Sequence, residues 1–162
     1  WIGGGQGSEG IIIRSTNEGD SWETMQSFER PIEKIQFVNS TTGFASSDSR
    51  VYKSTNGGAN WVDINLPTSG YFLTFYMANA NIGYASNWDN TYKTLDGGAT
   101  WFEQNTVLPN TSFRDIDFAP GSTSIGWMCG SDGAIVYTNN SGGGAIGIEP
   151  ISGNVPEKYS LS

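Results

Sequence analysis

The feature that most constrains this chain is a ten-residue stretch that occurs twice. "YKSTNGGANW" ends at Trp61 and "YKTLDGGATW" ends at Trp101, while a related stretch, "RSTNEGDSW", ends at Trp22. The tryptophans are 39 and 40 residues apart. Self-similarity at a fixed period of this length indicates a repeat architecture in which each repeat is one supersecondary unit. A fourth copy, "YTNNSGGGA", ends at Ala145 and lacks the tryptophan.

Each repeat predicts four short strands. The first strand has apolar residues at alternate positions: "IEKIQF" from Ile32, "FLTF" from Phe72 and "FRDIDF" from Phe113. The second strand carries an aromatic residue at one shared position: Trp1, Phe44, Tyr84 and Trp127. The third strand carries Val-Tyr-Lys or a variant of it, and the fourth begins at the tryptophan. Four strands in about 40 residues are typical of a propeller blade, so we expect an all-β protein built from β-propeller blades of four antiparallel strands.

The chain holds about three and a half such repeats. The predicted units are 1–28 (partial), 29–67, 68–108 and 109–146 (degenerate). Residues 147–162, in which Pro150, Gly153 and Pro156 interrupt regular structure, predict an extended linker. Because an open sheet edge is an aggregation hazard, we expect residues before Trp1 or another chain to complete the ring. The start at Trp1, with no signal peptide, favours a mature product or a fragment.

Composition excludes several classes of function. The 162 residues carry a formal charge of −8, which argues against a nucleic-acid partner or an anionic membrane surface. No apolar run approaches the roughly 20 residues that span a bilayer, so no membrane insertion is expected. The chain has no histidine and one cysteine, which excludes a zinc site of nitrogen and sulfur ligands and a Ser-His-Asp triad. We predict no metal and no cofactor, and a buried, inert thiol for Cys129 in "GWMCG".

The repeated stretch resembles the Asp-box, or BNR repeat, Ser/Thr-x-Asp/Asn-x-Gly-x-x-Trp. This box recurs in sialidase-like and xyloglucanase-like propellers and in Ycf48-like propellers. Its positions here are Ser15, Asn17, Gly19 and Trp22; Ser54, Asn56, Gly58 and Trp61; and Thr94, Asp96, Gly98 and Trp101. Two boxes carry Asn in place of Asp, and the fourth, Thr138-Asn140-Gly142, lacks the aromatic residue. The resemblance implies a propeller with structural boxes on the face opposite any active site.

The chemistry of the box favours a structural role. The Asp or Asn side chain can accept backbone N–H bonds across a tight turn. The glycines reach positive φ without steric cost, and the tryptophan can bury apolar area against the blade. A calcium loop is the alternative, but it needs several oxygen ligands around one ion, and each turn offers at most one or two acids.

Catalytic candidates are few. Sialidase-like enzymes need three arginines and a Tyr/Glu nucleophile pair, whereas Arg14 lies inside a box and Arg50 in a turn, and no local motif of that family is present. Glycosidases in general need two carboxylates. Asp115 and Asp117 are two apart on a predicted inner strand and share one face, so they are the best pair. Solvated acids that line a central channel explain them equally well, and we therefore assign no catalytic residue.

Binding candidates come from positions where the repeats differ. Trp88 falls in a predicted turn where the sister repeat has Asp48. An exposed aromatic residue there can stack on a sugar ring or a protein partner, and packing on a neighbouring blade is the alternative. Arg114 is the second binding candidate. "SGYF" (69–72) precedes an inner strand and is expected to belong to the core.

The ending "VPEKYSLS" resembles the lead-in to the C-terminal sorting domain of type IX secretion, and a plain linker is the alternative. This resemblance implies a protein secreted by a Gram-negative bacterium or displayed on its outer surface, and it speaks against a photosystem role. We expect a non-enzymatic scaffold that binds protein or glycan, or that assembles with copies of itself into an extracellular structure. The alternative is a fragment of a propeller glycoside hydrolase, sialidase-like or xyloglucanase-like.

Overall fold

The computed structural model describes residues 1–66, 71–104, 111–141 and 149–150. These residues form four antiparallel sheets and contain no α-helix, only a short 3₁₀ helix at Ser131–Gly133. Within every sheet the strands are neighbours in the order in which they occur in the chain. The prediction of an all-β protein built from blades of antiparallel strands is therefore confirmed.

The four sheets follow the four repeats. The first contains β1 (Ile2–Gln6), β2 (Glu9–Arg14) and β3 (Glu23–Phe28). The second contains β4 (Ile32–Phe37), β5 (Gly43–Ser47), β6 (Arg50–Ser54) and β7 (Val62–Asp63). The third contains β8 (Phe72–Met77), β9 (Gly83–Asn87), β10 (Thr91–Thr94) and β11 (Phe102–Gln104). The fourth contains β12 (Phe113–Phe118), β13 (Gly126–Gly130), β14 (Ile135–Thr138) and β15 (Glu149–Pro150).

The two terminal sheets differ from the two central ones. Within the described residues, the first sheet has no strand equivalent to β4, β8 and β12, and β1 occupies the place of β5. The fourth sheet ends in β15, which lies inside the 147–162 segment predicted as a linker. The remainder of that segment, with the residues that carry the resemblance to a secretion signal, lies outside the described residues.

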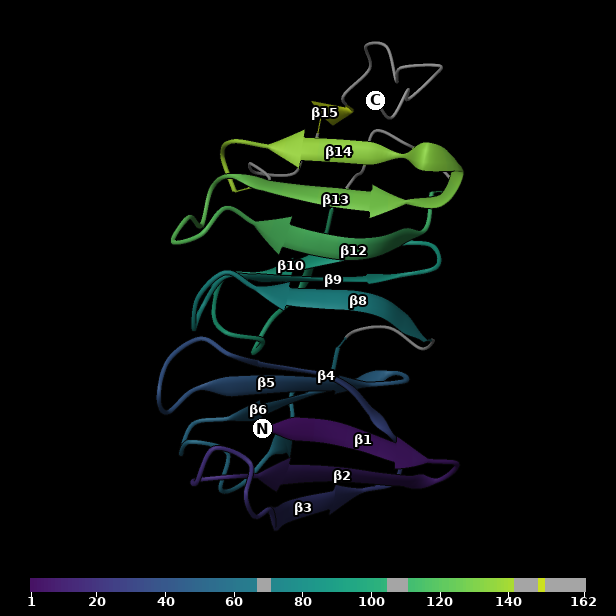
Figure 1. Ribbon diagram of the computed structural model, residues 1–162. Coiled ribbons are helices and arrows are strands. Elements are labelled where there is room, and N and C mark those ends of the chain that lie inside the picture. Colours follow the sequence, from purple (N-terminus) through teal and green to yellow (C-terminus); the bar gives the residue numbers. More distant parts are fainter. Residues whose placement is uncertain (67–70, 105–110, 142–148, 151–162) are drawn as a thin grey trace, which may run out of the picture.

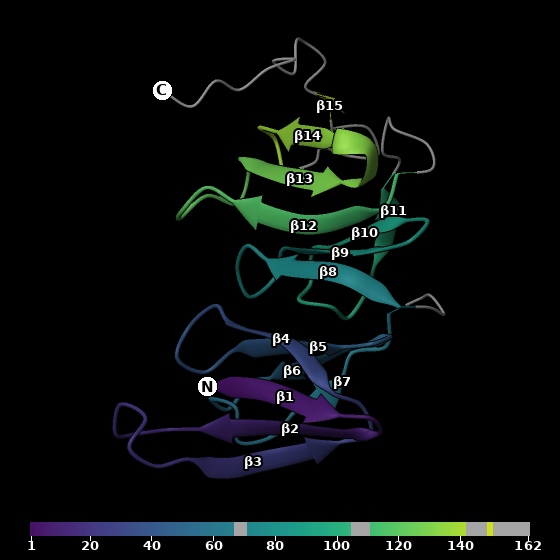
Figure 2. The ribbon, with the colours of Figure 1, turned by 45° about the vertical axis from the view of Figure 1, so that its right-hand side comes forward.

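The sheets fan out around their inner strands and form an open arc. In Figure 1 the first sheet extends downward from β1 to β3, and the fourth extends upward from β12 to β15. Neighbouring sheets contact each other through their first described strands, since β1 contacts β4 and β8 contacts β12. Figure 2 shows the same succession after a turn of 45°. The arc is part of a propeller, and no other described sheet covers the outer faces of the first and fourth sheets.

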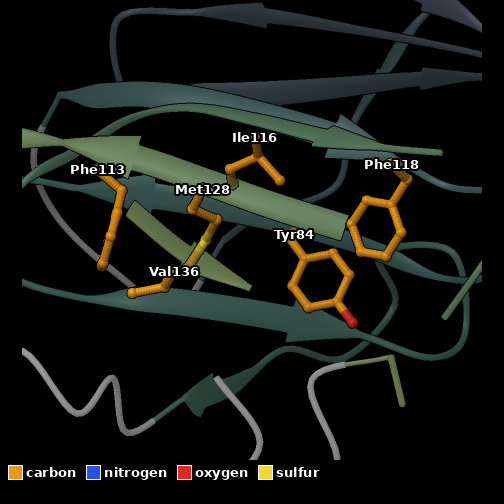
Figure 3. Close-up of a cluster of buried hydrophobic side chains, with 6 residues drawn as sticks. All are labelled: Tyr84, Phe113, Ile116, Phe118, Met128 and Val136. Carbon is orange, nitrogen blue, oxygen red and sulfur yellow. The ribbon is translucent and has the colours of Figure 1, made fainter. Parts of the chain in front are cut away.

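Each pair of neighbouring sheets buries one apolar core. Alternate residues of each strand point to opposite faces, so a sheet contributes one side to the core before it and the other side to the core after it. Between the third and fourth sheets, Tyr84 of β9 packs among five residues of the fourth sheet: Phe113, Ile116, Phe118, Met128 and Val136 (Figure 3). The core between the second and third sheets contains Phe44, Val51, Phe75, Met77 and Ala85.

Side-chain amides also join neighbouring sheets. The Gln36 side chain on β4 donates to the backbone carbonyl of Met77 at 2.7 Å and accepts from its N–H at 2.9 Å. Gln26 on β3 makes the same two bonds with the backbone of Trp61, at 3.2 and 2.9 Å. Each side-chain amide thus bonds both the N–H and the carbonyl of one residue of the next repeat, and this fixes how the two sheets are aligned.

The repeated turns share one hydrogen-bond pattern. In the third copy, the Thr94 hydroxyl accepts from the Gly98 N–H at 2.8 Å and donates to Asp96 at 2.9 Å. Asp96 also accepts from the Thr100 N–H at 2.8 Å. The equivalent bonds recur around Ser15 and Ser54. The fourth copy keeps the hydroxyl bond from Thr138 to Asn140.

The tryptophans of these turns are not buried to the same extent. Trp61 is buried, and its ring N–H donates to the Gly58 carbonyl at 3.1 Å. Trp101 is half-buried, and its ring nitrogen is buried without a hydrogen-bond partner among the described residues. Trp22 remains 43% exposed, so the first turn contributes less apolar burial than the second.

The prediction that Cys129 is buried is wrong, because the thiol is exposed. On β13, Gly126 and Met128 face the third sheet, so Trp127 and Cys129 point to the opposite, uncovered side. The apolar residues of "GWMCG" predict a strand, but they do not tell which of its two faces is covered.

Candidate functional site

The sheets have two different ends. One end carries the repeated turns, which connect the third and fourth strands of a sheet. The opposite end, called the rim here, carries the connections between the second and third strands: 7–8, 48–49, 88–90 and 131–134. The repeated turns are alike in sequence and the rim connections are not, so the repeats differ from one another mainly at the rim.

Trp88 and Arg114 meet at the rim. Trp88 lies in the connection between β9 and β10 and is 50% exposed. The guanidinium carbon of Arg114, which is itself exposed, lies 5.3 Å from the centroid of the Trp88 ring. The Ser112 hydroxyl donates to the Trp88 carbonyl at 2.9 Å. The two predicted binding residues thus form one cation–π pair between the third and fourth sheets, and Trp88 keeps half of its surface exposed.

A β-bulge places Arg114. In the pairing of β12 with β13, Phe113 faces Gly130 and Asp115 faces Cys129, so Arg114 is the extra residue. Such a bulge re-aims a side chain at the edge of a sheet. The first strands of the second and third sheets shift register at the same place.

This bulge corrects the prediction of strictly alternate apolar residues in the first strands. The buried residues of β12 are Phe113, Ile116 and Phe118, with a spacing of three and then two. That spacing in "FRDIDF" was the available signal for the bulge. The meeting of Arg114 with Trp88 had no such signal, because it depends on how two sheets pack.

The connection that carries Trp88 is held rigidly. The side-chain oxygen of Asn87 accepts from the N–H groups of Asp89 at 3.0 Å and Asn90 at 2.7 Å. This Asx turn fixes the backbone on both sides of Trp88. The backbone that carries the indole is therefore held by the side chain of the preceding residue.

Arg114 differs from the paired arginines. Arg30 forms an ion pair with Asp48 at 3.7 Å, and Arg50 forms one with Asp63 at 3.3 Å. Among residues 1–66, 71–104, 111–141 and 149–150, no carboxylate forms an ion pair with Arg114. Within the described part of this acidic protein, its guanidinium donors at the rim have no carboxylate partner.

Tyr71 adds a second exposed aromatic side chain to this end of the third sheet. It directly precedes β8, whose first residue Phe72 pairs with Asn87, so Tyr71 lies near the start of the Trp88 connection. The expectation that "SGYF" belongs to the core is wrong for Tyr71, because the inner strand begins only after it. Residues 69–70 and the Phe72 side chain lie outside the described part of the chain.

The two catalytic candidates lie on β12, just after Arg114. Asp115 and Asp117 are exposed and share one face of β12, where they pair with Cys129 and Trp127. Each carboxylate accepts the N–H of the residue that follows it, at 3.0 and 2.8 Å respectively. β12 is an edge strand of its sheet, so these bonds satisfy backbone donors that have no neighbouring strand.

A groove of about 320 Å³ lies between the inner strands β4, β8 and β12. Its polar lining is Lys34, Gln36, Tyr76, Asp115 and Asp117. Burial raises the pKa of the Tyr76 hydroxyl, and the negative charge of Asp117 raises it further. The groove can hold a polar ligand, but both carboxylates already serve the edge of their own strand.

The described part of the chain contains no group of three or more His, Cys, Asp or Glu side chains that could hold a metal ion. It also contains no helix with the length and apolar character needed to cross a bilayer.

Comparison with known proteins identifies the architecture. No protein-family model matches the sequence, and no curated protein matches it. Among solved structures, YCF48 from Cyanidioschyzon merolae is similar with a TM-score of 0.65 at 17% identity, over 81% of this chain and 47% of that one. A structure of YCF48 bound to D1 peptide has a TM-score of 0.60 at 21% identity, over 75% and 39%. The GH74 enzyme of Niastella koreensis has a TM-score of 0.65 at 16% identity, over 81% and 24%.

These similarities show the fold alone, and the chain spans less than half the length of each of these structures. The neighbours include both a peptide-bound propeller and propeller enzymes. A choice between binding and catalysis must therefore rest on the side chains of this protein.

Proposed function

We propose that this protein is a non-enzymatic propeller scaffold with structural Asp-boxes that binds a protein or a glycan through Trp88 and Arg114. The observation that carries the proposal is the half-exposed Trp88 ring with the Arg114 guanidinium stacked over it, 5.3 Å from the ring centroid. The resemblance of the tail to a type IX secretion signal supports secretion or display on the outer surface of a Gram-negative bacterium.

The pair also indicates what the ligand should carry. An exposed indole offers a flat apolar face to a sugar ring or an apolar side chain. Arginine presents a planar fork of donors that matches carboxylates and phosphates, and stacking on an aromatic ring pre-orients that fork. We therefore expect a ligand with an anionic group beside a flat apolar surface. The structure described as YCF48 bound to D1 peptide supports the view that a propeller of this architecture can bind a peptide.

The test is binding of the full chain to arrays of acidic and neutral glycans and peptides, followed by titration of the best ligand. Trp88→Ala and Arg114→Ala should each weaken binding about tenfold or more, as for a central aromatic or arginine residue of an interface. The melting temperature should stay nearly unchanged, because both side chains are exposed.

Trp22→Ala is the matched control, since Trp22 is similarly exposed but lies at the opposite end of its sheet. It should leave binding unchanged. Equal losses for Trp22→Ala and Trp88→Ala, or no loss with either rim variant, would contradict the assignment of the site.

The alternative function is glycoside hydrolysis, favoured by the GH74 neighbours and by the pair Asp115 and Asp117. A hydrolase should release product from xyloglucan or sialosides, and Asp117→Asn should abolish the release. Absence of turnover across such a panel would end this alternative, while a product-forming chain insensitive to Asp117→Asn would move catalysis to other residues.

A further inference from the structure

Two of the contacts between successive sheets share one feature. Here a side chain faces forward when it points to the sheet that follows in the chain, and backward when it points to the sheet before. In the second and third sheets, the aromatic residue of the second strand, Phe44 or Tyr84, faces forward and is buried by the following sheet. Around Tyr84 lie Met128 and Val136, which form a cross-strand pair on the fourth sheet (Figure 3). At the contact between the third and fourth sheets, a forward-facing aromatic residue thus inserts against a backward-facing cross-strand pair. At the contact between the first and second sheets, Trp1 instead stacks on Phe37 and lies edge-on to Trp61.

The fourth sheet presents the forward half of the contact seen at Tyr84, and no other sheet of the described residues covers it. Trp127 occupies the place of Tyr84, yet it is 41% exposed where Tyr84 is 2% exposed. Its partners on this outer face, Ile135 and Cys129, are also exposed, and Tyr137 packs beside the Trp127 ring at 5.6 Å between centroids. Tyr137 stands where Lys53 and Lys93 stand in the earlier sheets, so this face is the more apolar.

The first sheet presents the backward half. Ile2 and Ile13 form a cross-strand pair at the positions of Met128 and Val136. Ile12, which precedes Ile13 on β2 and pairs with Gly3, is fully buried against the second sheet, so Ile13 points to the opposite, outer face. Ile2 is exposed and Ile13 is only partly buried, although their counterparts in the fourth sheet are buried.

We propose that two copies of this chain associate head to tail, with Trp127 of each copy against Ile2 and Ile13 of the other. A second copy is the expected partner, because the two outer faces carry the two halves of the contact that joins the third and fourth sheets within the chain. The first and fourth sheets lie at opposite ends of the arc (Figure 1). One copy aligns with 47% of the YCF48 chain from Cyanidioschyzon merolae, so two aligned segments together match about the length of that chain. A two-fold pair forms this contact twice and closes, as a soluble assembly requires.

The first measurement is the mass of the full chain by sedimentation velocity over a range of concentrations. The expected result is a species of twice 17.4 kDa that dissociates on dilution. A monomer at every concentration, or an open-ended series of larger species, would overturn the two-copy ring.

Two variants test the faces. Trp127→Glu and Ile2→Lys should each raise the dimer dissociation constant at least tenfold, because each places a charge in an apolar contact. A dimer broken by Trp127→Glu but indifferent to Ile2→Lys would instead be a contact between two fourth sheets, and it would overturn the head-to-tail arrangement. Trp88→Ala, at the rim, is the control and should leave the mass unchanged. Circular dichroism establishes that each variant is folded.

Cys129 supplies a readout on the unmodified chain. Its counterparts Ser86 and Ser46 are buried by the following sheets, so association should protect the Cys129 thiol. Reaction with a maleimide should be at least several-fold slower above the dissociation constant than below it. A thiol that reacts equally fast in the dimer and the monomer would overturn the placement of the contact on this face.

Discussion

The two ends of the sheets differ in how similar the repeats of this chain are to one another. At one end, Ser15, Ser54 and Thr94 make the same bonds within three turns. At the rim, Asp48 and Trp88 occupy equivalent places but behave differently: Asp48 is paired with Arg30, whereas Trp88 holds Arg114 with no carboxylate partner among the described residues. The comparison teaches that the constant end holds the hairpins together and the variable end is free to acquire ligands.

The largest expected effect lies at the constant end. Trp61→Ala should lower the free energy of unfolding by about 3–5 kcal/mol, because it empties a buried site of ring size. Trp61 packs with Ile12, Ile32 and Tyr52 and donates to the Gly58 carbonyl. Urea denaturation measures the loss.

Trp22→Ala is the control for this prediction, since the same position of the first turn is 43% exposed. Its cost should be clearly smaller than that of Trp61→Ala. Equal costs would mean that the turn itself, and not burial of the ring, sets the contribution of the tryptophan.

The prediction at the rim replaces the residue of the third sheet with the residue found at the same place in the second sheet. Trp88→Asp gives Arg114 a carboxylate at the place where Asp48 pairs with Arg30, and it should abolish ligand binding while changing stability by only about 0.5 kcal/mol or less. Titration of the bound ligand and thermal melting measure the two quantities. Retained affinity in this variant would show that the guanidinium alone, without the indole, carries recognition.

The sequence predicted the repeated part of the molecule well and the individual part poorly. The four sheets follow from a period that is repeated, and the exposure of Trp88 follows from its departure from the pattern. The exposed side of Cys129 was missed because it depends on whether another sheet covers β13. The Arg114–Trp88 contact was missed because a bulge and the packing of two sheets together create it.

The smallest expected effect is a pH dependence of stability that one repeated turn has and the others lack. Hydrogen bonds from the Thr100 hydroxyl and backbone N–H, and from Thr94, lower the pKa of Asp96 from 3.8 to about 2. Because the folded-state pKa is the lower one, the carboxylate stabilises the fold above about pH 4, and this contribution disappears as the pH falls through about 2. The turns around Asn17 and Asn56 have no such titration.

Melting temperatures of the parent chain and of Asp96→Asn, compared between pH 7 and pH 2.5, measure this difference. The advantage of the parent over Asp96→Asn should shrink as the pH falls, while a constant difference would mean that the carboxylate charge contributes nothing to the turn. Asn56→Asp is the reciprocal change. It should gain a weaker pH dependence, because Asn60, at the position of Thr100, donates its N–H at 3.0 Å but has no hydroxyl to add a second bond.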